Sequence, residues 1–120
     1  MFIIHYLIKN IFYQYNYTTP ASFCQYINDL LIKYVGINKN IVIANPNAPT
    51  GIALTLSQIE EIVKSNPDNI VLIDEAYVDF GGESAIPLIR KYDNLMITGT
   101  FSKSRSMAGA RLGFGIASSA

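Results

Sequence analysis

The stretch Ile70-Val71-Leu72-Ile73-Asp74-Glu75-Ala76-Tyr77 decides the fold, because four apolar residues run directly into two acids and a tyrosine. A short continuous apolar run is typical of a strand that is buried on both faces of a parallel sheet. The same pattern occurs in Ile41-Val42-Ile43-Ala44, before a loop rich in asparagine and proline, and in Leu95-Met96-Ile97-Thr98, before a serine-rich turn. The sequence therefore predicts three buried strands, each followed by a polar cluster.

Helical signals separate these strands. Thr55 and Gln58 form a capping box, and apolar residues follow at helical spacing as far as Val63. We also predict a short helix over residues 84–92 and a fourth strand over residues 112–117. Strands that alternate with helices predict an α/β fold in three layers, with a mostly parallel sheet and helical crossovers. Because ligands of such sheets bind at the C-terminal edge of the strands, the three polar clusters are expected to face one site.

The composition sets the broad class of the protein. The chain has 120 residues, half of them hydrophobic, which suits one ordinary domain. Nine basic residues balance nine acidic ones, which argues against a dedicated nucleic-acid-binding protein. One cysteine and one histidine nearly exclude a Cys/His zinc site within the chain, and the single cysteine favours a cytoplasmic location. The apolar residues 1–12 are too few to span a membrane, so no targeting segment is predicted.

Residues 1–40 differ from the rest of the chain. Residues 1–19 hold four of the eight tyrosines, and the first acidic residue is Asp29. Ser22 and Gln25 form a second capping box, which predicts a helix over residues 22–35. We therefore expect an atypical N-terminal segment, followed by a main domain over residues 41–120.

Lys103 follows the third strand, within Thr100-Phe101-Ser102-Lys103-Ser104-Arg105, and Arg111 lies eight positions further on. A lysine in a serine-rich turn is usually a solvated surface residue, and this stretch by itself favours that interpretation. An amine held at the end of a strand can instead form a covalent bond with a carbonyl cofactor. Ser102 and Arg111 could then hold a phosphate group, for which arginine offers a planar fork of donors.

Asp74 ends a buried strand, so its carboxylate is expected to be partly buried and to need a cation or a donor. The protonated nitrogen of a pyridine ring is one such partner, and Tyr77 could reach the ring's phenolic oxygen. The ordinary alternative is that Asp74 caps the following turn and Tyr77 packs against the sheet. Asp74 and Tyr77 follow the second predicted strand and Lys103 follows the third, and this arrangement favours the cofactor hypothesis.

Three separated motifs carry a resemblance to a known family. They are Asn45-Pro46-Asn47-Ala48-Pro49-Thr50-Gly51, Asp74-Glu75-Ala76-Tyr77, and Thr100-Phe101-Ser102-Lys103 followed by Ala108-Gly109-Ala110-Arg111-Leu112-Gly113-Phe114. In this order and at these spacings the chain resembles the class I/II aminotransferases of fold type I, and among them the histidinol-phosphate aminotransferases. The resemblance covers about residues 41–117.

The resemblance implies pyridoxal 5'-phosphate as cofactor and a homodimer as the assembly. Lys103 would be the Schiff-base lysine, Asp74 would pair with the pyridine nitrogen and Tyr77 would bond the ring oxygen. Ser102 and Arg111 would hold the phosphate. The implied reaction moves an amino group between L-histidinol phosphate and 2-oxoglutarate in histidine biosynthesis, with small-molecule substrates and no nucleic-acid, membrane or metal partner.

The chain departs from the family pattern in its first loop and in its extent. Ala48 stands where the family has an asparagine that bonds the ring oxygen, so Asn47 is carried over only as a weak candidate. No counterpart of the family's N-terminal site residues is recognisable in residues 1–40, and we expect residues 1–120 not to include the family's C-terminal small domain. We therefore expect a partial large domain, inactive by itself and poorly soluble.

Two kinds of alternative remain open at this point. Another class I/II aminotransferase, for example an aromatic one, or a threonine-phosphate decarboxylase could carry the same motifs. In a different class, the chain could be a non-catalytic remnant that keeps the fold without the cofactor.

Overall fold

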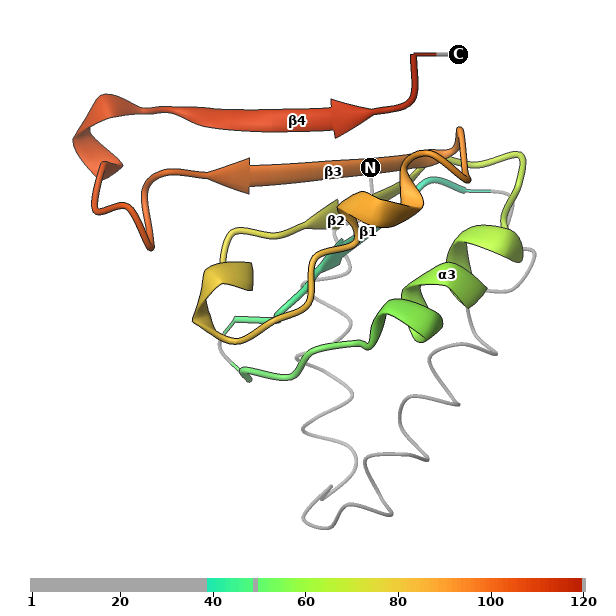
Figure 1. Ribbon diagram of the computed structural model, residues 1–120, viewed down its shortest axis with the longest axis horizontal. Coiled ribbons are helices and arrows are strands. Elements are labelled where there is room, and N and C mark those ends of the chain that lie inside the picture. Colours follow the sequence, from blue (N-terminus) through green and yellow to red (C-terminus); the bar gives the residue numbers. More distant parts are fainter. Residues whose placement is uncertain (1–38, 49, 120) are drawn as a thin grey trace, which may run out of the picture.

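The computed structural model describes residues 39–48 and 50–119, and its centre is a four-stranded sheet in the order β1-β2-β3-β4 (Figure 1). The strands are β1 (Ile41–Ala44), β2 (Val71–Asp74), β3 (Leu95–Thr100) and β4 (Gly113–Ala117). The helix predicted over residues 22–35 and the atypical segment before it lie outside the described residues. No helix among the described residues has both the length and the apolar character needed to cross a membrane.

The sheet is parallel except at one edge. β1 pairs with β2 and β2 with β3 in parallel, so that Ala44, Asp74 and Thr98 are neighbours in register. β4 pairs with β3 in the antiparallel sense. This arrangement confirms the three predicted strands and brings their C-terminal ends to one edge, where the three polar clusters begin.

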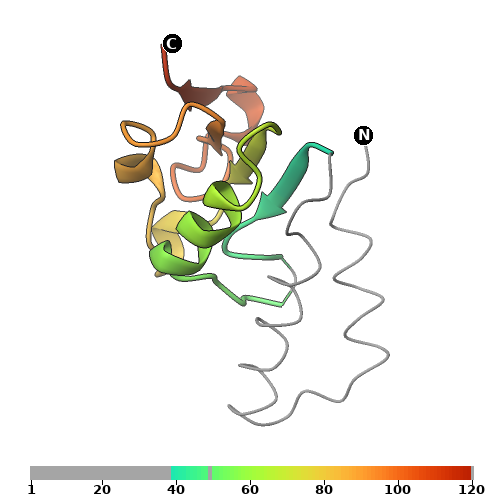
Figure 2. The same ribbon diagram turned by 90° about the vertical axis from the view of Figure 1, so that its right-hand side faces the viewer.

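The helix α3 (Leu56–Lys64) forms the crossover between β1 and β2 and lies along one face of the sheet (Figures 1 and 2). The predicted capping box is present: the Thr55 hydroxyl accepts from the Gln58 amide, and the Gln58 side chain accepts from the Thr55 amide. Both bonds satisfy amides that the first helical turn leaves unpaired. The buried side chains of α3 pack with those of the three parallel strands into one core, which includes Ile41, Ile43, Ile59, Ile62, Val63, Val71, Ile73, Leu95 and Ile97.

The helix predicted over residues 84–92 is wrong. The segment contains only the 3-10 helix η2 (Ile86–Leu88), followed by tight turns. Leu88 donates to the Ala85 carbonyl and Lys91 to the Leu88 carbonyl, both across three residues. Bonds across three residues define 3-10 turns, a geometry that proteins use in short connecting segments.

β4 is far more exposed than the other strands. Of its five residues only Ile116 is half-buried, and Phe114 keeps 43% of its surface. The Phe114 ring lies against Gly99 of β3, where any side chain would collide with it. β4 is therefore attached to the core mainly by its pairing with β3.

Candidate active site

Asp74 lies at the C-terminal edge of the sheet, between Ala44 and Thr98 of the neighbouring strands. Its carboxylate is half-buried, and its Oδ1 accepts from the Ala76 amide at 3.2 Å and from the Thr98 hydroxyl at 3.5 Å. The other oxygen, Oδ2, has no hydrogen-bond partner among the described residues. Asp74 is thus oriented by one oxygen and can accept from a donor or cation with the other.

Glu75, the next residue, is the most deeply buried acid of the described chain, with 4% of its surface exposed. Its carboxylate accepts from the Ser84 hydroxyl at 2.7 Å and from the Ala85 amide at 2.6 Å. These bonds close the loop that follows β2 and hold it against the strand. Glu75 was not predicted as a site residue, because its partners are nine and ten positions away and no local pattern announces them.

The loop after β1 is held by its own asparagines. The buried Asn45 side chain accepts from the Leu54 amide at 2.7 Å and donates to the Leu54 carbonyl at 3.3 Å. The Oδ1 of Asn47 accepts from the Thr50 hydroxyl at 2.9 Å. Within the described residues the Nδ2 of Asn47 has no hydrogen-bond partner, although only 7% of the residue is exposed. Asn47 therefore offers a fixed amide donor.

A cavity of about 470 Å³ lies between this loop and the one after β2. Its lining combines apolar residues with Asn47 and Tyr77. The residues that line it are Pro46, Asn47, Ala48, Gly51, Ala53, Tyr77, Phe80 and Gly81. The predicted candidates Asn47 and Tyr77 thus line one cavity together with Ala48, whose side chain is apolar.

Lys103 lies in the turn after β3, residues 101–107, which we call the lysine turn. Its Nζ is 5.3 Å from the centre of the Tyr77 ring, a distance at which an ammonium is attracted to the ring face. Ser102 is half-buried, and its Oγ accepts from the Thr100 hydroxyl at 2.9 Å, which leaves the Ser102 hydroxyl proton free to be donated elsewhere. The structure therefore places the amine of Lys103, which follows β3, close to the ring of Tyr77, which follows β2.

Among the described residues, the Arg111 side chain makes no hydrogen bond or ion pair with the members of this group. Arg111 is exposed, in the left-handed region with a φ of 53°, and its guanidinium donates to the Ala108 carbonyl at 3.3 Å. That is the only contact of the Arg111 side chain within the described residues. Of the predicted phosphate pair, Ser102 thus has a hydroxyl proton left to donate, whereas the Arg111 guanidinium donates to a carbonyl of its own turn.

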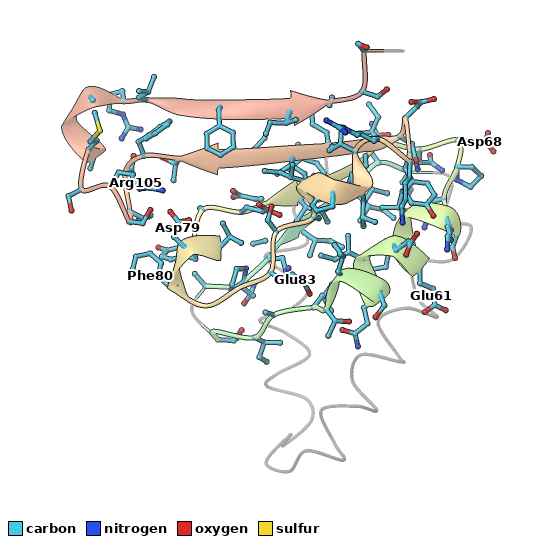
Figure 3. The ribbon with its side chains drawn as sticks, viewed as in Figure 1. Glu61, Asp68, Asp79, Phe80, Glu83 and Arg105 are labelled. Carbon is cyan, nitrogen blue, oxygen red and sulfur yellow. The ribbon has the colours of Figure 1, made fainter. Side chains whose placement is uncertain are left out.

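Asp79 is a second residue that the sequence patterns did not identify. It belongs to the 3-10 helix η1 (Val78–Phe80), two positions after Tyr77, and it contacts Ser104 and Arg105 of the lysine turn (Figure 3). Contacts across 25 residues of sequence have no local signature. The described residues also contain no group of three or more histidine, cysteine or acidic side chains placed to hold a metal ion.

The edge of the sheet thus gathers an amine, a phenol, a free carboxylate oxygen, an amide donor and a serine hydroxyl. This set suits a ring that carries an aldehyde, a phenolic oxygen, a basic nitrogen and an anionic substituent, because each group has a complementary partner type. Comparison with known proteins agrees. The sequence profile of the family described as "Aminotransferase class I and II" matches residues 7–120. The chain therefore belongs to the class I and II aminotransferase family.

Within this family, the chain is similar to histidinol-phosphate aminotransferases. A histidinol-phosphate aminotransferase from Lactococcus lactis subsp. cremoris (strain SK11) is 64% identical over 85 residues, which are 71% of this chain and 24% of that protein. The chain thus spans about a quarter of the length of the curated relatives it matches.

Solved structures show the same fold. The histidinol-phosphate aminotransferase from Clostridium acetobutylicum matches with a TM-score of 0.65 and 28% identity, over 76% of this chain and 28% of that one. The L-threonine-O-3-phosphate decarboxylase from Porphyromonas gingivalis matches with a TM-score of 0.59 and 30% identity, over 64% and 26%. A PLP-bound C-S lyase from Staphylococcus hominis matches with a TM-score of 0.59 and 27% identity, over 76% and 25%. These similarities confirm the predicted fold class.

Proposed function

We propose that residues 41–120 are the cofactor-binding part of an enzyme that transfers an amino group between L-histidinol phosphate and 2-oxoglutarate in histidine biosynthesis. The cofactor is pyridoxal 5'-phosphate. The observation that carries the proposal is the approach of the Lys103 amine to Tyr77, one strand away from the free carboxylate oxygen of Asp74.

When bound, pyridoxal phosphate supplies a ring that takes up electrons from the bonds at the substrate's Cα. Asp74 would keep the ring nitrogen protonated through its free Oδ2, while the Ala76 amide and the Thr98 hydroxyl fix the orientation of the carboxylate. Lys103 would hold the cofactor through Nζ, and the neutral Lys103 amine would carry a proton to and from the substrate carbon.

Tyr77 and Asn47 would both donate to the ring's phenolic oxygen from the cavity that they share. Because Thr50 occupies the Oδ1 of Asn47, the side chain has its Nδ2 left to donate. Asn47 would in this way supply an amide that Ala48 lacks.

Ser102 and Arg111 would hold the phosphate. The Ser102 hydroxyl has its proton available, because its oxygen already accepts from Thr100. Arg111 would have to exchange its contact with the Ala108 carbonyl for the phosphate, which offers a charged acceptor in place of a neutral one.

The active form that we propose is a cytoplasmic homodimer acting on small molecules: an amino-alcohol phosphate or amino acid, and a 2-oxo acid. Residues 41–120 would be the large-domain part of the site, and the residues that select the amino donor would lie outside it.

A segment exchange tests the proposal. The matching 85-residue segment of the Lactococcus lactis relative is replaced by the corresponding segment of this chain, and transfer from L-histidinol phosphate to 2-oxoglutarate is measured. We expect turnover within about tenfold of the parent enzyme, since a lost hydrogen bond at Ala48 costs roughly 1 kcal/mol. Lys103→Met in the same hybrid is the matched control and should abolish turnover. A folded, dimeric hybrid without turnover would refute the proposal and favour a non-catalytic remnant.

A second candidate reaction is decarboxylation of L-threonine phosphate, which the structural similarity to the Porphyromonas gingivalis enzyme favours. The same segment can be exchanged into that decarboxylase, with carbon dioxide release as the assay. The aminotransferase proposal predicts that the segment retains a larger share of the parent's rate in the aminotransferase host, and the reverse order would favour the decarboxylase.

A further inference from the structure

The lysine turn is tied to the loop after β2 through one carboxylate, that of Asp79. The Ser104 hydroxyl donates to Oδ2 of Asp79, and the Nη2 of Arg105 lies 3.7 Å from the same oxygen. In Figure 3 the labelled Asp79 and Arg105 side chains lie close together at one end of the sheet. Two successive residues of the turn, directly after Lys103, thus converge on one acid.

Asp79 itself is firmly held. It follows Tyr77 by two residues, in the 3-10 helix η1, where the Val78 amide donates to the Glu75 carbonyl at 3.1 Å and the Gly82 amide donates to the Val78 carbonyl at 2.9 Å. The buried carboxylate of Glu75 fixes this loop further. The acid is therefore carried by a part of the protein that is anchored in the core.

The other bonds of the lysine turn do not fix it against Tyr77. The Ser106 amide donates to the Lys103 carbonyl and the Met107 amide to the Phe101 carbonyl, both at 3.0 Å, so these bonds close the turn on itself. The Phe101 amide donates to the Leu112 carbonyl, so this bond joins the lysine turn to the residue before β4, within the hairpin that β3 and β4 form. In the described part of the chain, Asp79 is the acid that links this hairpin to the loop after β2, which carries Tyr77.

We propose that Asp79 is a positioning residue, which holds the lysine turn so that the Lys103 amine stays over the Tyr77 ring. Any use of this position in catalysis rests on the proposed function. The position itself is a property of the protein without cofactor and can be measured there.

Competitive acetylation of the cofactor-free 120-residue chain with trace acetic anhydride, read by mass spectrometry, measures the accessibility of each amine. Asp79→Ala should raise the rate at Lys103 by about two- to fivefold, the range expected when an exposed cation leaves a ring face. Lys91, exposed on another part of the molecule, serves as the internal reference, and its rate should not change.

Four further variants separate positioning from loss of charge or stability. Ser104→Ala leaves every charge in place and should also raise the Lys103 rate. The double variant with Asp79→Ala should add little, because the two residues share one interaction. Asp79→Asn keeps an acceptor for Ser104 and should give a rate between those of wild type and Asp79→Ala. Glu83→Ala, the removal of an exposed acid with no side-chain contact among the described residues, should have no effect.

An unchanged Lys103 rate in both Asp79→Ala and Ser104→Ala would overturn the proposal, and so would equal increases at Lys103 and Lys91. A second readout adds pyridoxal phosphate at a subsaturating concentration, followed by borohydride. Asp79→Ala should lower the trapped fraction at Lys103 several-fold, and saturating cofactor should restore it. If wild type traps no cofactor at Lys103, the proposed function fails, while the acetylation result still decides the role of Asp79.

Discussion

β2 and β3 are neighbours in the sheet, yet the segments that follow them differ in how they are held. After β2, Glu75 is buried and accepts two short hydrogen bonds. The loop over residues 75–85 ends at Ala85, which is fully buried in the core. After β3, nearly every residue from Lys103 to Gly115 is exposed. The half of the site that would recognise the ring is thus anchored to the folded core through Glu75, whereas the half that carries the reactive amine depends on a few surface contacts.

The largest expected effect is a difference in the free energy of unfolding between variants in the core and variants in β4. Ile97→Ala empties a fully buried position of β3 and should lower the free energy of unfolding by about 2–5 kcal/mol. Phe114→Ala, on β4, removes a side chain that is 43% exposed and should cost about 1 kcal/mol or less. Urea unfolding followed by circular dichroism measures both. Equal costs would contradict the contrast between the two regions.

The second effect concerns Glu75. Glu75→Ala removes an acceptor shared by the Ser84 hydroxyl and the Ala85 amide and should cost about 1–3 kcal/mol of stability. Glu83→Ala, in the same loop but exposed, is the matched control and should stay within about 0.5 kcal/mol of wild type. If both variants unfold at the same urea concentration, the buried carboxylate does not hold the loop.

The third effect sharpens the account of the cavity. Ala48→Asn adds an amide to the cavity that Asn47 and Tyr77 line and should tighten pyridoxal phosphate binding by about fivefold, which corresponds to roughly 1 kcal/mol for one hydrogen bond. Fluorescence or absorbance titration of the cofactor measures the change. Ala48→Ser, which is too short to mimic the amide, is the control. Unchanged or weaker binding in Ala48→Asn would mean that a side chain at position 48 cannot join Asn47 and Tyr77 at the ring oxygen.

The smallest effect is a pH dependence of stability that arises from the contact between Glu60 of α3 and Tyr92, which precedes β3. The hydrogen bond from the Tyr92 hydroxyl, at 2.7 Å, lowers the pKa of Glu60 below its ordinary 4.5, helped by Lys64 and Lys91, while partial burial opposes the shift. A carboxyl group with a lowered pKa in the folded state stabilises the fold above its unfolded pKa, and this contribution is lost as the pH falls through the folded value.

Tyr92→Phe should therefore show a slightly shallower loss of stability than wild type as the pH drops below about 4.5, measured by thermal unfolding across that range. Identical pH profiles would show that the Tyr92–Glu60 bond contributes nothing to folding.

The sequence patterns predicted the parts of the fold that depend on local chemistry. The apolar runs marked the three parallel strands, and Thr55 with Gln58 marked the start of α3. The edge that gathers Asp74, Tyr77 and Lys103 followed from the parallel order of the strands.

The parts that were missed depend on long-range partners. Glu75 looked like an ordinary residue beside Asp74, and Asp79 like a polar residue in a loop, because Ser84, Ala85, Ser104 and Arg105 are distant in sequence. The contact of Arg111 with Ala108 was equally invisible, since it depends on the left-handed conformation of Arg111. The mistaken helix over residues 84–92 had apolar residues at suitable spacing, but the segment forms tight turns instead.

The central claim is that Lys103, among the lysines of this chain, is the one that reacts with the cofactor. The most direct measurement is to add pyridoxal phosphate to the 120-residue chain, reduce with borohydride and map the modified lysines by mass spectrometry. The account predicts a pyridoxyl group on Lys103 at cofactor concentrations that leave the exposed Lys64 and Lys91 unmodified. Modification spread evenly over the exposed lysines, or absent from Lys103, would contradict it.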